Sequence, residues 1–326
     1  MTLILVLGAT GFIGGHIARQ ALAQGWRVRG LRRRPGAVGA GTGEGIDWFE
    51  GDLDRAEGLA PAFEGAEIVF HAAGFYPVGA NRAPEATARG VAQTRNVLEA
   101  CRRAGVARLV YTSTLSTIGG PPPGEGRLAD ERDLYLPGSL PGSAYYECKY
   151  AMESEVLRAA GNSALVLNPT AVLGPGDVHL SLARVLLAAA RGQMGFWVRA
   201  TTNVVDVRDV AAAHLRAAEV GRPGERTILG GHNLTVRDLL ERVARLTGRQ
   251  PPRRELPLGV LDAAAWLASV TPGLAGGIGH LRAVRRWQGY DTSKARRDLG
   301  ATPRPLEDTL RDALDWLESN GHRWRP

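Results

Sequence analysis

The stretch TLILVLGATGFIG at residues 2–14 decides the fold of this 326-residue chain. Its first six residues are almost wholly apolar, as expected of a strand buried on both faces of a parallel sheet. Gly8, Gly11 and Gly14 follow, and apolar residues then return with helical spacing. A strand, a glycine turn and a helix in this order form a phosphate cradle, because glycine lets the backbone approach a ligand and a helix N-terminus binds an anion.

This turn predicts a dinucleotide-binding site at the start of a doubly wound α/β (Rossmann) fold. The glycine spacing is G-x-x-G-x-x-G, which differs from the G-x-G-x-x-G of the common fingerprint. Its place directly after an apolar N-terminal strand favours a dinucleotide site over a simple surface turn. The expected cofactor contacts in the turn are Gly8, Thr10, Gly11, Phe12, Ile13 and Gly14.

Composition indicates an ordinary soluble globular protein, with 44 % hydrophobic and 22 % charged residues. No apolar run approaches the roughly 20 residues of a membrane span, and the N-terminal segment lacks the basic leader of a signal peptide. Cys101 and Cys148 are the only cysteines and lie in helix-like segments, so a disulfide framework is not expected. A cytoplasmic location is therefore the expectation.

The net charge of +7 does not by itself indicate a nucleic-acid partner. The arginines are scattered through helix-like segments, and no basic run is interleaved with aromatic residues. Such a charge favours anionic small molecules instead. The sequence also shows no metal-ligand spacing, so no metal is expected.

The second predicted strand, residues 26–35, carries three arginines at its end. In a dinucleotide fold this strand end faces the adenosine ribose, where a carboxylate binds the 2′-hydroxyl of NAD and an arginine accommodates the 2′-phosphate of NADP. The first acidic residue of the chain is Glu44, well past the strand. Arg33, with Arg32 or Arg34 beside it, is therefore expected to pair with the phosphate, which predicts NADP rather than NAD.

The ends of the next two predicted strands supply further expected contacts. The third strand ends in Asp52, which with Leu53 is expected to contact adenine, and a capping role for Asp52 is compatible with this. The fourth ends in Ala72 and Ala73, whose small side chains would let a cofactor lie against the backbone. Tyr76 follows as a candidate substrate contact.

Two groups of side chains point to chemistry. The fifth strand runs into the hydroxyl cluster TSTLST at 112–117, at the strand end where open α/β sheets bind ligands. Tyr145 and Lys149 are four residues apart and share a helix face. An ammonium near a tyrosine lowers its pKa from the usual value of about 10, so that the phenol can act as an acid or base. Because this arginine-rich chain has only one other lysine, Lys294, a compact ammonium is expected to matter opposite Tyr145.

Taken together, the glycine turn, the hydroxyl cluster, Tyr145-x-x-x-Lys149 and NPTAVLGP at 168–175 resemble an extended short-chain dehydrogenase/reductase. This is the NAD-dependent epimerase/dehydratase family, and the chain resembles most its branch of dihydroflavonol-4-reductase-like proteins and hopanoid-associated sugar epimerases. The likeness covers essentially the whole chain, including residues 222–231 and 291–300.

The resemblance implies a hydroxyl–tyrosine–lysine site. By position, Thr114 matches the catalytic hydroxyl of the family, with Ser113 as the alternative and a possible substrate contact. Tyr145 matches the proton donor or acceptor. Lys149 would bind the nicotinamide ribose and hold down the tyrosine pKa. The remaining implied cofactor contacts are Thr112, Pro169 and Val172.

The resemblance also implies a homodimer that forms through the helices at 84–104 and 143–161. One departure from the family pattern matters. Residues 90–96 read GVAQTRN where the family has roughly N-V-x-G-T-x-N, so Gly90 replaces an asparagine. Any role of that asparagine in helix geometry or in a proton relay is therefore in question.

The chain is expected to form two parts. Residues 1–175 form the dinucleotide-binding domain, to which 203–220 return, whereas 176–202 and 221–326 form a smaller substrate-binding lobe in which Trp197 lines the pocket. Within the lobe, an apolar segment at 251–290 is expected to close over the substrate. Its large apolar residues are Leu261, Trp266, Leu267, Leu281 and Trp287.

Two helix starts are predicted after the chain enters the lobe. Asp209 is expected to cap a helix that contains His214. Thr235 and Asp238 have the spacing of a capping box, with Asp in the place where Glu is preferred.

The sequence predicts an NADP-dependent oxidoreductase that reduces a carbonyl group of a small molecule, or oxidises the corresponding alcohol. One alternative is a nucleotide-sugar epimerase or dehydratase that keeps its cofactor tightly bound. Another is a non-catalytic NADP(H) sensor, against which the intact hydroxyl–tyrosine–lysine set argues. The lack of an obvious basic pair for a diphosphate favours a hydrophobic ketone over a sugar nucleotide as the substrate.

Overall fold

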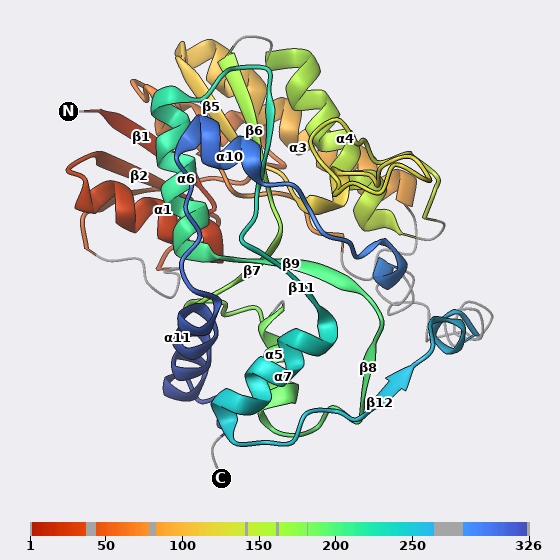
Figure 1. The fold of residues 1–326 in the computed structure, drawn as a ribbon. Helices are drawn as coiled ribbons and strands as arrows, with labels where there is room; N and C mark the ends of the chain where they lie inside the picture. Colours follow the sequence, from red (N-terminus) through yellow and green to blue (C-terminus); the bar gives the residue numbers. More distant parts are fainter. Residues whose placement is uncertain are drawn as a thin grey trace.

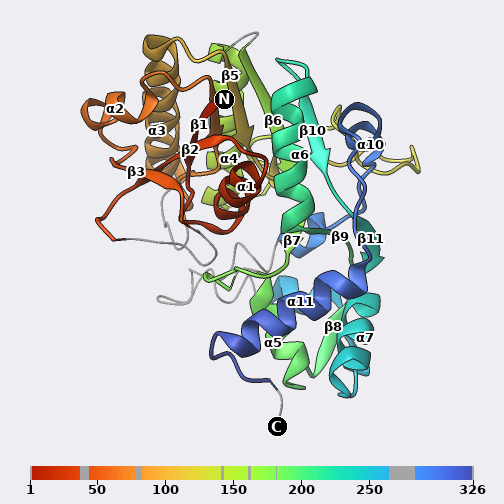
Figure 2. The ribbon, with the colours of Figure 1, turned by 90° about the vertical axis from the view of Figure 1, so that its left-hand side faces the viewer.

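The computed structural model of the chain describes residues 2–36, 44–77, 83–140, 143–160, 163–180, 182–263 and 283–324. Within these residues, seven parallel strands form one sheet in the order β10-β6-β5-β4-β1-β2-β3 (Figures 1 and 2). The strands are β1 (Leu3–Leu7), β2 (Arg27–Arg32), β3 (Ile46–Glu50), β4 (Ile68–His71), β5 (Arg108–Thr112), β6 (Ala164–Pro169) and β10 (Arg226–Leu229).

Helices cover both faces of this sheet, as the apolar strand β1 predicts. Ile4 and Val6 belong to the core on one face, and Leu5 and Leu7 belong to the core on the other. Figure 1 shows α3 and α4 on one side of the sheet and α1 and α6 on the opposite side. The covering helices are α1 (Phe12–Ala23), α2 (Ala60–Phe63), α3 (Ala83–Ala104), α4 (Ala144–Ala160), α6 (Val207–Val220) and α10 (Ser293–Leu299). The predicted doubly wound fold is confirmed.

The strand order places a topological switch point next to β1. The chain moves from β1 outward to β2 and β3, then returns to β4 on the opposite side of β1. In the sheet register Leu7 lies opposite Leu31 of β2 and His71 of β4, so the three strands end along one edge. Open α/β sheets bind ligands at this edge.

A smaller lobe lies below the main sheet in Figure 1 and contains the C-terminal helix. Among the described residues its core is formed by three helices packed around a second sheet of strand order β11-β9-β7. The predicted capping box is confirmed, because Thr235 and Asp238 bond reciprocally at the start of the second of these helices. The elements of the lobe are β7 (Ala171–Leu173), α5 (Ala183–Ala190), β8 (Phe196–Val198), β9 (Thr201–Asp206), β11 (His232–Thr235), α7 (Val236–Thr247), β12 (Arg254–Leu256) and α11 (Leu306–Ser319).

The division between the two parts differs from the predicted one in four segments. β7, which the prediction places at the end of the dinucleotide-binding domain, pairs with β9 in the sheet of the lobe. β10 joins the main sheet as an edge strand beside β6, and α10 packs on β10 and α6, although both were assigned to the lobe. β9 was assigned to the segment that returns to the main domain, but it pairs with β7 and β11 instead. β10 has only four residues, of which two are polar, and this short pattern does not indicate its pairing with the buried strand β6.

The cap of α6 is also corrected. The side chain of Asp206 accepts a hydrogen bond from the Arg208 backbone N–H at 2.7 Å and caps the helix. Asp209, the predicted cap, lies in the first turn and pairs with Arg304 at 2.7 Å. The two aspartates are three residues apart, and each suits a helix start in sequence.

Four other predictions concern membrane spans, metal sites, the closing segment and the homodimer. No helix in the described part of the chain is long and apolar enough to cross a membrane. The described residues likewise hold no group of metal-ligating side chains. Residues 264–282 of the predicted closing segment, with Trp266, Leu267 and Leu281, lie outside the described residues. The homodimer stays a prediction.

Candidate functional site

The glycine turn after β1 brings backbone against backbone. Gly8 has φ of +87°, and a Cβ added there would lie 2.9 Å from the carbonyl carbon of Ala72. A Cβ on Gly14 would lie 2.2 Å from the Gly8 carbonyl oxygen. A side chain at either position would therefore collide with backbone atoms, so the close approach of the turn to α1 and to the end of β4 requires glycine.

The start of α1 is left open to an anion. Gly11 is its N-cap and provides no side-chain hydrogen bond, and its first turn has no acidic residue. The first N–H groups of the helix and its dipole therefore face no capping side chain. Beside this turn, Ala72 and Ala73 are small and partly buried, and the Ala72 N–H donates to Leu7. This arrangement fits the diphosphate of a dinucleotide.

The arginines after β2 differ in their surroundings. Arg32 is partly buried, lies 3.7 Å from Glu50, and has its guanidinium over the Trp48 ring at 5.6 Å. Arg33 is exposed. Its positive charge is one of the smaller influences that lower the pKa of Asp54, after the hydrogen bond from Arg89. Of Arg32 and Arg33, Arg33 is therefore the one available to a ligand.

The predicted adenine contacts lie on a loop that α3 holds in place. The side-chain amide of Asn96 donates to the Leu53 carbonyl at 2.8 Å. One Asp52 carboxylate oxygen accepts from the Asp54 backbone N–H at 3.1 Å. Asp52 thus closes the local turn, and this hydrogen bond leaves its other carboxylate oxygen for a ligand.

The structure brings Thr114, Tyr145 and Lys149 together at the edge where the sheet strands end. Thr114 follows β5 and lies at the start of a short 3₁₀ turn, whereas the other two lie on α4. The Tyr145 hydroxyl donates to Thr114 Oγ1 at 3.3 Å. Lys149 Nζ lies 5.9 Å from the centre of the Tyr145 ring.

The predicted direction of the Tyr145 pKa is not found in this structure. Burial raises the pKa of Tyr145, and this influence exceeds the lowering by its hydrogen bond to Thr114. Burial also lowers the pKa of Lys149 to about 8. Both shifts favour the neutral form, as expected for groups removed from water. The ammonium lies by the ring of Tyr145, and the desolvation of the phenol dominates.

The Ser113 hydroxyl is hydrogen-bonded to a residue other than Tyr145. It donates to the carboxylate of Glu153, a buried residue of α4 that sequence reasoning missed. This placement favours Thr114 over Ser113 as the hydroxyl partner of Tyr145. The spacing Tyr145, Lys149, Glu153, in steps of four along one helix, was the available signal.

Thr112 has a protein partner for its hydroxyl. His214 Nδ1 lies 2.8 Å from the Val210 carbonyl oxygen, so this nitrogen carries the proton. The other ring nitrogen then accepts from Thr112 Oγ1 at 2.8 Å. Burial lowers the pKa of His214 to about 4, so the ring is neutral at pH 7. The Thr112 side chain thus ties β5 to α6.

The remaining predicted residues separate into two places. Pro169 ends β6 and Val172 lies in β7, directly after the edge where the strands end. Tyr76 is 53 % exposed, and its ring centre lies 4.9 Å from that of Tyr145. Trp197 lies in the smaller lobe, where the Arg237 guanidinium of α7 covers its ring at 5.5 Å.

Gly90 allows α3 and α4 to pack closely. A Cβ at this position would lie 2.6 Å from Cys148 Sγ and 2.9 Å from Met152 Sδ. Cys148 directly precedes Lys149 in α4. The space beside residue 90 is thus filled by two sulfur-containing side chains of α4, which leave no room for an asparagine without a shift.

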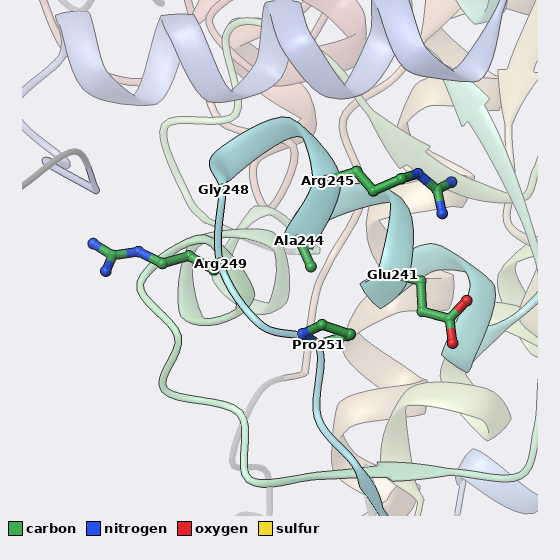
Figure 3. Close-up of a pocket in the computed structure, with 6 residues that line it drawn as sticks. All are labelled: Glu241, Ala244, Arg245, Gly248, Arg249 and Pro251. Carbon is green, nitrogen blue, oxygen red and sulfur yellow. The ribbon is translucent and has the colours of Figure 1, made fainter.

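A hollow on the far lobe is unrelated to this site. Figure 3 shows it at the end of α7, with the side chains of Arg245 and Arg249 pointing away from each other. None of the predicted site residues lines it. The lining residues are Glu241, Ala244, Arg245, Gly248, Arg249 and Pro251.

Comparison with known proteins identifies the family. The family model for the NAD dependent epimerase/dehydratase family matches residues 4–230. A putative dihydroflavonol 4-reductase from Synechocystis sp. is 32 % identical over 329 residues, which cover 97 % of this chain and 95 % of the relative. Sterol demethylase protein B from Methylococcus capsulatus is 31 % identical over 329 residues, with 97 % and 98 % covered.

A solved structure agrees with these sequence relatives. The crystal structure of a nucleoside-diphosphate-sugar epimerase from Pseudomonas aeruginosa has a TM-score of 0.82 and 30 % identity. The match covers 98 % of this chain and 99 % of that one. The chain thus belongs to the NAD-dependent epimerase/dehydratase family and is an oxidoreductase-type enzyme of that family with a nicotinamide-cofactor-binding Rossmann domain.

Proposed function

We propose that this enzyme is an NADP(H)-dependent oxidoreductase that interconverts a carbonyl group and an alcohol on an apolar ring compound. The observation that carries the proposal is the hydrogen bond from Tyr145 to Thr114, with Lys149 beside the same ring, at the sheet edge that also holds the glycine turn. Two hydroxyl groups that converge in this way can hold one carbonyl oxygen between them.

When bound, the nicotinamide supplies or accepts the hydride. Tyr145 gives a proton to the substrate oxygen in the reduction direction, and its raised pKa keeps the phenol protonated at neutral pH. Thr114 orients the substrate oxygen. Lys149, with a pKa of about 8, is mostly protonated at pH 7 and can return a proton toward Tyr145 through a bound hydroxyl group.

Arg33 supports NADP over NAD. It is exposed directly after β2, where the ribose phosphate of NADP would lie. Glu50, a carboxylate near this strand end, already faces Arg32 at 3.7 Å. An exposed arginine without a competing ribose-binding carboxylate on β2 suits a 2′-phosphate.

A wall of aromatic rings supports an apolar substrate. The Tyr76 ring lies beside that of Tyr145 at a tilt of 57°, Tyr146 lies edge-on to Tyr145 at 5.9 Å, and the Arg286 guanidinium covers Tyr146. Such rings bury flat apolar surface well. The names of two relatives refer to a dihydroflavonol and a sterol, which are both compounds with fused carbon-rich rings.

A panel of substrates tests the proposal. Polycyclic and aromatic ketones are mixed with enzyme and NADPH, and the absorbance of the reduced nicotinamide is followed. We expect stoichiometric loss of NADPH with at least one ketone. Conversion of sugar nucleotides with no net absorbance change would instead show an epimerase. Binding of NADPH with neither reaction would favour the sensor.

A further inference from the structure

A buried polar cluster lies directly behind the hydroxyl loop, residues 113–117. Its centre is Glu153, which is 3 % exposed and lies one helical turn beyond Lys149 on α4. Glu153 Oε2 accepts hydrogen bonds from the Ser113 hydroxyl, from Thr117 Oγ1 at 2.6 Å and from Asn168 Nδ2 at 2.7 Å. The carboxylate therefore holds both ends of the loop that carries Thr114.

The negative charge of Glu153 is balanced inside the protein. Arg226 Nε lies 2.7 Å from Glu153 Oε1, and Arg226 is 8 % exposed on β10. The same guanidinium donates to the Thr117 carbonyl at 2.8 Å and to the Glu131 carbonyl at 3.2 Å. Burying two charges is costly unless they are paired and hydrogen-bonded. These two side chains form an ion pair, and each also makes hydrogen bonds to other groups of the cluster.

The cluster also reaches the backbone of the proposed reacting residue. Asn168 Nδ2 donates to the Thr114 carbonyl oxygen at 3.3 Å and to Thr117 Oγ1 at 2.9 Å. Glu153 and Asn168 thus fix the loop on both sides of Thr114. Because Tyr145 lies on the same rigid helix as Glu153, the cluster sets the separation between the Thr114 and Tyr145 hydroxyl groups.

We propose that Glu153, held by Arg226, is a positioning residue that places Thr114 against Tyr145. The inference rests on the proposed function, because it assigns Glu153 to the alignment of that same pair. Glu153 does not meet substrate or cofactor in this account. It acts through the hydroxyl loop, because it determines the position of that loop relative to α4.

A second buried glutamate of α4 provides a matched control. Glu155 is 8 % exposed and pairs with Arg95 at 2.8 Å and Arg158 at 2.7 Å. Both arginines belong to helices, and neither belongs to the hydroxyl loop. Glu153→Gln and Glu155→Gln therefore remove the same charge from the same helix, but only the first change reaches Thr114.

Two readouts are measured on both full-length variants: ketone reduction with NADPH, and hydrogen–deuterium exchange of the backbone amides of residues 113–117. For Glu153→Gln we expect kcat to fall about 100-fold, the cost of a small misplacement of a reacting group, with KM for NADPH changed by less than about threefold. Amide exchange in the loop should accelerate. Glu155→Gln should leave kcat within about twofold and exchange in the loop unchanged.

A double variant separates positioning from a general loss of stability. If Glu153 acts through Thr114, then Glu153→Gln should lower kcat by less than about twofold in a Thr114→Ala background. A further fall in kcat of about 100-fold in the Thr114→Ala background would overturn the proposal. Unaltered amide exchange of residues 113–117 in Glu153→Gln would overturn it as well. Should Glu153→Gln fail to fold, Ser113→Ala removes one donor to the same carboxylate and should lower kcat by about three- to tenfold with faster loop exchange; unchanged exchange in Ser113→Ala would equally overturn it.

The two readouts also distinguish this proposal from the proposed function. If the wild-type enzyme reduces no ketone, the proposed function fails. Faster loop exchange in Glu153→Gln and not in Glu155→Gln would still support the positioning role in that case. Equal exchange in all three proteins would reject the positioning role whatever the activity.

Discussion

Two charged side chains lie one helical turn apart on α4, and their surroundings are opposite. Glu153 accepts three hydrogen bonds and pairs with a guanidinium. Lys149 lies beside an aromatic ring, and within the described residues no carboxylate pairs with it. The first site is complete within the protein, and the second leaves a cation for a ligand. Glu153 is therefore suited to hold other protein groups in position, whereas Lys149 is suited to contact a ligand.

The largest effect is expected from the phenol that lies at the start of this helix face. Tyr145→Phe should lower turnover by about 10³-fold, because it removes the proposed proton donor. NADPH affinity should stay nearly unchanged, as measured by fluorescence titration. Tyr150→Phe is the control, since it lies on the same helix and its ring contacts Tyr135. Wild-type rates in Tyr145→Phe would contradict the assigned role.

Lys149→Met should change activity and stability in opposite directions, because Lys149, unlike Glu153, has no charged partner in the part of the chain that the structure describes. Turnover should fall by about 100-fold. The unfolding free energy at pH 7 should rise by about 1 to 3 kcal/mol, because a buried ammonium without a partner is removed. The pKa of Lys149 is lowered from its ordinary 10.5 to about 8. The loss of stability that the buried ammonium causes is therefore complete below about pH 8 and disappears as pH rises toward 10.5. The stability gain should shrink over that interval in denaturant titrations.

Lys294→Met is the matched test for this prediction. Lys294 Nζ lies 2.9 Å from Glu225 and donates to the Arg226 carbonyl at 2.5 Å. Its loss should therefore destabilise the protein by about 1 kcal/mol. A stability gain in Lys294→Met, or a loss in Lys149→Met, would remove the distinction between the two lysines.

Arg33→Ala tests the cofactor end of the site. The NADPH dissociation constant should rise by about 10- to 100-fold, whereas NADH binding should stay within about twofold, because only NADPH carries the phosphate. Arg27→Ala removes the same charge from the other end of β2 and serves as the control. Equal weakening of NADPH and NADH binding would argue against a phosphate contact.

The smallest effect is expected at the contact between α3 and α4. Gly90→Ala gains up to about 1 kcal/mol of helix propensity, but the added methyl group meets Cys148 and Met152, and overpacking of this kind costs about 1 to 3 kcal/mol. A net loss of about 1 kcal/mol in denaturant unfolding is expected. Cys148→Ala should reduce that loss; a loss that Cys148→Ala leaves unaltered would show that the cause lies elsewhere.

The features that could be predicted from sequence are those written in local patterns. The apolar strand before Gly8 and the four-residue step from Tyr145 to Lys149 each need only a short window of sequence. The Glu153 cluster depends on four partners from distant segments, and no local pattern brings them together. The pKa of Tyr145 depends on burial, which outweighs its hydrogen bond to Thr114, and the spacing of Tyr145 and Lys149 does not indicate that burial. The cap of α6 was assigned to Asp209 instead of Asp206 because both aspartates suit a helix start.

The most direct test of the account is a crystal structure of the enzyme with NADP⁺. We expect the diphosphate on the turn from Gly8 to Gly14, and the Tyr145 hydroxyl within about 3 to 4 Å of the reacting nicotinamide carbon. A diphosphate bound away from that turn, or a Tyr145 hydroxyl directed away from the nicotinamide, would contradict it.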